Sequence, residues 1–99
     1  MYFKYGEAGG GGISPSSDGK MVKIIYALFD GWRGRGLSLP LIMGLIERAV
    51  GTSNRVEMVY ASIDDGNVLS QKAVLACGFK RVETWSAMGR GFYQFNVIK

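Results

Sequence analysis

The sequence predicts an α/β (α+β) fold in which two helices pack on a mixed β-sheet. Runs rich in β-branched and aromatic residues alternate with runs in which apolar residues recur every three or four positions. A strand–helix–strand order favours a parallel pair of strands with a crossover helix, and two final strands around a glycine turn add antiparallel pairing. With 99 residues, the chain is expected to form a single domain with a thin core.

The first twenty residues are predicted to hold little regular structure. The aromatic residues of "MYFKYGE" favour a short strand. The following stretch "AGGGGISPSSDG", residues 8–19, collects glycine, serine and proline, and we expect a loop or linker there. The next run, "KMVKIIYALF" at residues 20–29, lies between Gly19 and Gly31 and has the composition of a largely buried strand.

The apolar spacing changes after residue 37 and predicts a helix over residues 38–50. Ser38 is suited to cap its start, and Gly51 is suited to end it. Pro40 falls in the first turn, where a helix does not use the missing amide donor.

The remaining elements follow the same alternation. The run "RVEMVYASI", residues 55–63, predicts a strand, and "NVLSQKAVLACGF" predicts a helix that Asn67 caps and Gly78 ends. The tail reads "KRVETWSAM", "GRG" and "FYQFNVIK", which predicts two strands around a turn.

The composition excludes several kinds of site. The chain has no histidine and a single cysteine, Cys77, so a Ser-His-Asp device, a histidine-ligated metal and an internal disulfide are excluded. Cys77 itself is interpreted as core packing rather than as a nucleophile. The net charge of +4 favours acidic partners, including phosphate-bearing cofactors. No run is long and apolar enough to span a membrane, and no secretory pattern opens the chain, so we expect a cytoplasmic protein with no membrane partner.

The segment "GWRGRGLSLP", residues 31–40, is the first candidate binding site. Its glycines fall between a predicted strand and a predicted helix, where free backbone amides and the positive end of the helix dipole favour an anion such as a diphosphate. Arg33 and Arg35 add positive charge. The alternative is a solvated basic turn. The spacing matches neither the nucleoside-triphosphate loop nor the dinucleotide motif.

A second group of residues makes the interpretation of residues 31–40 as a binding site more specific. Asn67, Ser70, Gly78 and Phe79 stand at offsets of zero, three, eleven and twelve. Together, the two segments resemble the GNAT superfamily of acetyl-CoA-dependent N-acetyltransferases. That family has the cofactor motif Q/R-x-x-G-x-G/A before a helix, which residues 33–38 match except for Ser38, and later an asparagine, a small residue and Gly-Phe.

The resemblance covers residues 21–98 and corresponds to the family's fourth strand onward. It implies a truncated acyl-CoA N-acyltransferase fold in which the strands at 21–29 and 55–63 splay apart and hold acetyl-CoA, the cosubstrate, between them. Residues 21–99 would then be the acetyl-CoA-binding core of one GNAT-like domain spanning 1–99. The cofactor-binding residues that it implies are Leu28, Phe29, Arg33, Gly34, Arg35, Gly36, Leu37, Ser38, Asn67 and Ser70.

Two departures from the family pattern bear on catalysis. The position that often holds a tyrosine general acid is Val74, which leaves turnover in question. The amino-terminal half, which walls the acceptor pocket in the family, is short. The acceptor site is therefore open, or completed by a second subunit in a homodimer, or the chain is a fragment. Glu57 is the predicted catalytic base, with an ordinary solvent-facing charge as the alternative reading.

The predicted function is transfer of an acetyl group from acetyl-CoA to an amine, either a small molecule or a protein lysine, by direct attack. One alternative is a CoA-binding protein without catalysis. A second, less favoured alternative is a small basic nucleic-acid-binding module. In that module, phosphate would meet Arg33, Arg35 and Arg90, and bases would stack on Trp32, Phe92 and Tyr93.

Overall fold

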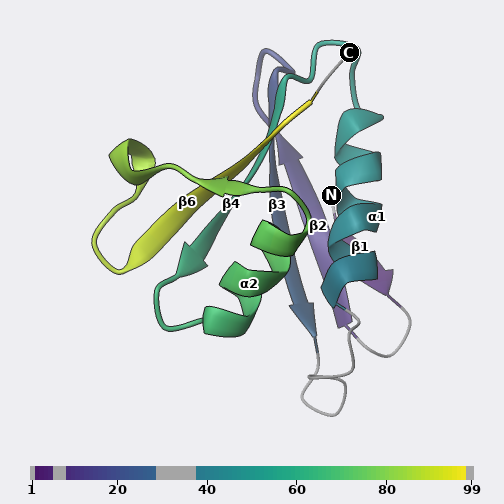
Figure 1. Cartoon of the computed structure of the whole chain (residues 1–99). Helices are drawn as coiled ribbons and strands as arrows, with labels where there is room; N and C mark the ends of the chain where they lie inside the picture. Colours follow the sequence, from purple (N-terminus) through teal and green to yellow (C-terminus); the bar gives the residue numbers. More distant parts are fainter. Residues whose placement is uncertain (1, 6–8, 29–37, 98–99) are drawn as a thin grey trace.

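The computed structural model describes residues 2–5, 9–28 and 38–97, which form a six-stranded mixed sheet with two α-helices (Figure 1). The strands are β1 (Tyr2–Tyr5), β2 (Gly9–Pro15), β3 (Met21–Leu28), β4 (Met58–Asp64), β5 (Lys80–Arg81) and β6 (Arg90–Asn96). The helices are α1 (Ser38–Val50) and α2 (Val68–Ala76), and a 3-10 turn, η2, covers Glu83–Trp85.

The sheet has the order β1-β2-β3-β4-β6-β5. Strands β3 and β4 are parallel and are connected through α1, whereas the other neighbouring strands pair antiparallel. The predicted mixed sheet with one parallel crossover and two helices is therefore confirmed. Both helices also have the predicted positions, and the Asn67 side chain caps α2 as expected.

The loop predicted over residues 8–19 is wrong for Gly9–Pro15, which form β2 and pair with both β1 and β3. The glycines serve close packing rather than flexibility. A Cβ on Gly11 would lie 2.7 Å from the carbonyl oxygen of Ile25 and 2.7 Å from Cδ1 of Leu45 on α1. Because Gly11 is buried and carries no side chain, Leu45 of α1 packs directly on the backbone of β2.

The tail keeps its predicted antiparallel pair, but β5 is much shorter than expected. After Arg81, the Val82 amide still donates to the Phe92 carbonyl (2.8 Å), and the hydroxyl of Ser86 bridges the Val82 carbonyl and the Phe92 amide. This hydroxyl accepts a hydrogen bond from the Phe92 amide (2.9 Å) and donates one to the Val82 carbonyl (2.8 Å). The chain then turns at Gly89, whose φ of +83° is costly for other residues.

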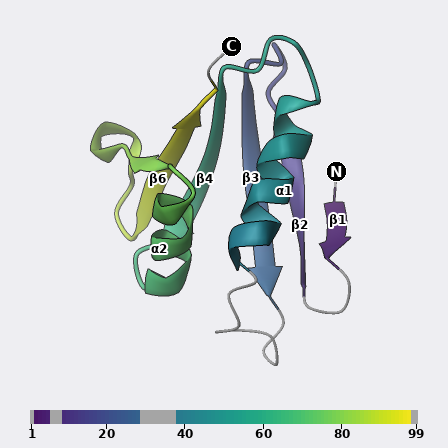
Figure 2. The ribbon, with the colours of Figure 1, turned by 45° about the vertical axis from the view of Figure 1, so that its right-hand side comes forward.

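The core lies between the sheet and the two helices, which cover the same face (Figures 1 and 2). Its buried members are Ile13, Val22, Ile24, Leu41, Ile42, Leu45, Ala49, Val56, Val59, Ala61, Ile63, Val74, Phe79 and Tyr93. Strand alternation sends Lys23, Ile25, Tyr60 and Phe92 to the opposite face. Neither described α-helix covers that face, where Trp85 of η2 packs on Phe92. No described helix is long and apolar enough to cross a membrane.

Candidate functional site

A cleft of about 370 Å³ opens where β3 and β4 part. The two strands pair at Met21↔Met58, Val22↔Val59 and Lys23↔Tyr60, and in the described part of the chain their pairing stops there. Beyond this point, backbone groups along the inner edges of β3 and β4 lack the partners that a continued ladder would supply. The cleft is lined by Lys23, Ile24, Ile25, Tyr26, Ala61, Ser62, Ile63, Asp64, Asn67, Ser70 and Arg90.

The first turn of α2 forms the far end of the cleft. The Asn67 Oδ1 atom accepts a hydrogen bond from the Ser70 amide at 3.2 Å, which leaves the Asn67 amide nitrogen as a donor. Gln71 fixes the preceding turn, because its Nε2 donates to the carbonyls of Asp64 (3.1 Å) and Asp65 (2.9 Å). The predicted binding residues Asn67 and Ser70 are thus brought together beside the cleft.

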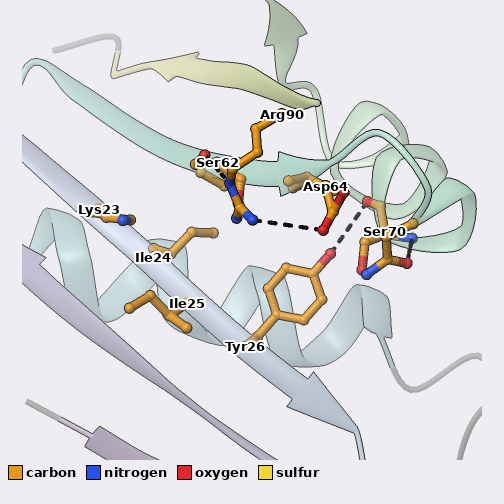
Figure 3. Close-up of a pocket in the computed structure, with 11 residues that line it drawn as sticks. Lys23, Ile24, Ile25, Tyr26, Ser62, Asp64, Ser70 and Arg90 are labelled. Carbon is orange, nitrogen blue, oxygen red and sulfur yellow. Dashed lines mark hydrogen bonds and ion pairs between the residues drawn. The ribbon is translucent and has the colours of Figure 1, made fainter. Parts of the chain in front are cut away.

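Tyr26 spans the gap between β3 and α2. Its hydroxyl donates to the Ser70 carbonyl at 3.2 Å, as Figure 3 shows. Burial raises the pKa of Tyr26 above its ordinary value, against the opposing effect of the hydrogen bond with Ser70. The phenol therefore stays protonated at neutral pH and keeps donating. Tyr26 was not among the site residues predicted from the sequence, although it lies in the predicted strand two residues before Leu28.

Arg90 crosses from β6 over β4 into the cleft (Figure 3). Its Nε donates to the Ser62 hydroxyl at 3.0 Å and its Nη2 to the Ser62 carbonyl at 2.9 Å. Its Nη1 lies 3.9 Å from Oδ2 of Asp64. Ser62 and Arg90 were missed as cleft residues because their meeting depends on the β4–β6 register, in which Asp64 is opposite Arg90. Lys23 was missed because its place depends on the β3–β4 register, in which it is opposite Tyr60.

Several predicted site residues cannot be placed. Phe29 and the loop residues Arg33, Gly34, Arg35, Gly36 and Leu37 lie outside the described residues. Leu28 ends β3 and Ser38 begins α1, each described by its backbone. The glycine-rich segment therefore precedes the start of a helix, as its interpretation requires.

Two residues discussed for catalysis lie away from the cleft. Val74 is fully buried in the core. Glu57 precedes β4 and is exposed. It lies four residues before Ala61, which corresponds to about 13 Å along an extended strand. It is not among the residues that line the cleft, and its role as a base stays a prediction.

Cys77 packs against the core, and burial raises the pKa of its thiol, which suits packing better than nucleophilic attack. The described residues contain no group of acidic and cysteine side chains arranged for a metal ion.

The nucleic-acid alternative meets an obstacle in its aromatic residues. Tyr93 is 2% exposed and belongs to the core, so it cannot stack on a base. The ring of Phe92 lies 5.0 Å from that of Tyr60 and 5.4 Å from that of Trp85. Arg90 is exposed, but two hydrogen bonds to Ser62 orient its guanidinium over the cleft.

Comparison with known proteins identifies the architecture. No family model and no curated protein matches the sequence. Among solved structures, a protein from Acinetobacter baylyi, provisionally described as an acetyltransferase, has a TM-score of 0.72 and 25% identity over 91% of this chain. The GNAT domain of PAT from S. lividans has a TM-score of 0.76 and 14% identity over 91% of this chain. A GNAT phosphinothricin acetyltransferase from Sinorhizobium meliloti, solved with acetyl-CoA, has a TM-score of 0.75 and 20% identity over 91% of this chain.

The chain spans only part of these structures, covering 56%, 54% and 54% of their respective lengths. From its architecture, the chain has the acyl-CoA N-acyltransferase fold of the GNAT superfamily.

Proposed function

We propose that the protein is an acetyltransferase that binds acetyl-CoA in the cleft between β3 and β4 and transfers the acetyl group to an amine. The observation that carries the proposal is the parting of these strands after three residue pairs, directly beside the first turn of α2. The unpaired inner edge of β3 offers amides and carbonyls to the amide-rich pantetheine arm. Asn67 and Ser70 lie at the same end of the cleft.

The diphosphate is proposed to lie at the start of α1. The helix begins at Ser38, directly after the segment "RGRGL", and no acidic side chain in its first turn competes for the free amides. Arg33 and Arg35 supply the charge that a diphosphate needs. Gly34 and Gly36 keep side chains out of the space between backbone and ligand.

Acetyl-CoA supplies an acetyl thioester that the amine attacks, with loss of the CoA thiolate and a proton. The protein's part is to align the thioester along β3 and to keep the cleft in shape. Tyr26 helps to keep the cleft in shape, because its hydroxyl connects β3 to α2 by a hydrogen bond to the Ser70 carbonyl. Val74 is buried in the core at the position where the family often has a tyrosine general acid. Without that acid, the CoA thiolate can still leave, at a rate about 10² to 10⁴-fold lower.

Replacing Gly36 with valine tests the cofactor site. Coenzyme A at about 100 times its Kd is expected to stabilise the protein by about 2.7 kcal/mol, because it binds the native state alone. The melting temperature of the valine variant should be the same with and without coenzyme A, since the valine side chain fills the proposed diphosphate cradle. Differential scanning calorimetry with and without coenzyme A measures both. A full increase in the variant would show that this loop does not hold the diphosphate.

Acetyl transfer itself is tested by the release of free thiol from acetyl-CoA with a panel of amines. Oligonucleotides serve as the comparison ligand in the same calorimeter. Stabilisation by oligonucleotide but not by coenzyme A would overturn the proposal in favour of a nucleic-acid module.

Substitutions at Asn67 separate its two roles. Asn67→Asp should keep the cap, because aspartate and asparagine cap helices equally well, but it removes the amide donor proposed for the pantetheine arm. Asn67→Ala should lose both, at a cost of about 0.5–2 kcal/mol in the free energy of unfolding. We expect urea unfolding to distinguish the two variants and coenzyme A titration to show weakened binding in both. Wild-type coenzyme A affinity in Asn67→Asp would rule out the donor role.

A further inference from the structure

The two sides of the cleft differ in chemistry. Because side chains alternate along a strand, Ile24 and Tyr26 of β3 face the helices, together with Ala61 and Ile63 of β4. The side chains that carry charge, Lys23, Asp64 and Arg90, belong to the opposite side (Figure 3). The cofactor proposed above lies along β3 and α2, so an acceptor reaches the gap between the strands from this charged side.

Arg90 is positioned to bind a ligand there. Two hydrogen bonds to Ser62 orient its guanidinium, which has five N–H donors in total. The remaining donors meet Asp64 only at 3.9 Å, with the two side chains 53% and 68% exposed, so this ion pair is weak. A planar group of this kind pairs best with a carboxylate or a phosphate.

Lys23 adds a second positive charge on β3, at the end of the cleft where the two strands are still paired, and its side chain is half-buried (Figure 3). Among the cleft-lining residues, Asp64 is the one carboxylate, beside the two cations Lys23 and Arg90. The cleft therefore has an excess of positive charge and one negative group beside it.

We propose that this charged side is the acceptor subsite and that the acceptor is a small amine carrying its own anionic group, a carboxylate or a phosphate. The proposal rests on acetyl transfer as the proposed function. Arg90 and Lys23 bind the anionic group, and Asp64 faces the amine. Polyamines and lysine-rich peptides, which bring only positive charge, are disfavoured by the same two cations.

Matched pairs of amines test this charge requirement. Glycine, methionine and phenylalanine are compared with their carboxamides, and 2-aminoethyl phosphate with ethanolamine, by calorimetric titration of the protein saturated with coenzyme A. We expect the anionic member of at least one pair to bind about tenfold or more tightly, as charge-assisted bonds to a guanidinium predict. Equal binding within every pair, no binding by any anionic member, or tighter binding of spermidine would overturn the proposal.

Variants of the cations complete the test. Arg90→Gln and Lys23→Gln should each reduce the anionic preference about tenfold, while Arg90→Lys, which keeps the charge, should retain part of it. Lys80→Gln is the control, because it removes one positive charge from β5, away from the cleft. An unchanged preference in Arg90→Gln and Lys23→Gln overturns the proposal. Failure of coenzyme A to bind wild-type protein is a separate result and counts against the proposed function itself.

Discussion

Gly11→Ala is expected to destabilise the protein by about 1–3 kcal/mol, a large share of the stability of so small a domain. The added methyl group would lie 2.7 Å from the Ile25 carbonyl oxygen and 2.7 Å from Leu45 Cδ1. The Leu45 side chain can rotate away at some cost in packing. The Ile25 carbonyl belongs to β3, which is paired with β2, so it can move away only if the two strands shift relative to each other. Urea unfolding followed by circular dichroism measures the change.

The same substitution elsewhere in the chain gives a matched control. Gly44 lies within α1, and a Cβ there would have no atom within 4 Å. Gly44→Ala should therefore stabilise the protein by about 0.5–1 kcal/mol, because alanine loses less backbone freedom in a helix. Opposite signs for the two variants are the expected outcome. A Gly11→Ala protein as stable as wild type would mean that β2 does not lie against α1 as described.

Val74→Tyr is expected to destabilise the fold by about 1–3 kcal/mol and not to restore a general acid. The substitution introduces the residue that the family often has at this position. Here, however, Val74 is fully buried, and the ring would have to enter a filled core with its hydroxyl unpartnered. We expect a lower urea midpoint and no gain in the rate of thiol release from acetyl-CoA.

A smaller change at the same site separates crowding from chemistry. Val74→Ile adds one methylene and should cost less than about 1.5 kcal/mol. A Val74→Tyr protein that keeps wild-type stability and gains activity would show that α2 turns this position toward the cleft.

Much of the architecture could be predicted because local patterns and tertiary structure agree. The strand at β3, both helices and the Asn67 cap follow from apolar spacing and from residues that begin or end helices. The parallel pair follows from the order of these elements. Here, propensity, capping and burial all favour the same structure.

The errors arise where the environment overrides local preference. Glycines favour loops in isolation, but at β2 the close approach of α1 requires residues without side chains. In the tail, the Ser86 hydroxyl bridges Val82 and Phe92 where the ladder ends, and apolar alternation carries no sign of this. The charged side of the cleft depends on which residue of β6 lies opposite Asp64, a long-range register that composition does not encode.

The short ladder between β3 and β4 leaves two parts of the sheet joined by few backbone pairs, although one hydrophobic core spans both parts. Strands β1 to β3 with α1 form one, and β4 to β6 with α2 form the other, with three residue pairs of the sheet between them. We expect this short ladder to open more readily than its neighbours. Amides at Met21–Lys23 and Met58–Tyr60 that bond across it should exchange with deuterium earlier than those at the centres of the β2–β3 and β4–β6 ladders. A ligand seated across β3 and β4 would slow that exchange, which gives the cleft a signature in hydrogen-exchange kinetics independent of any turnover.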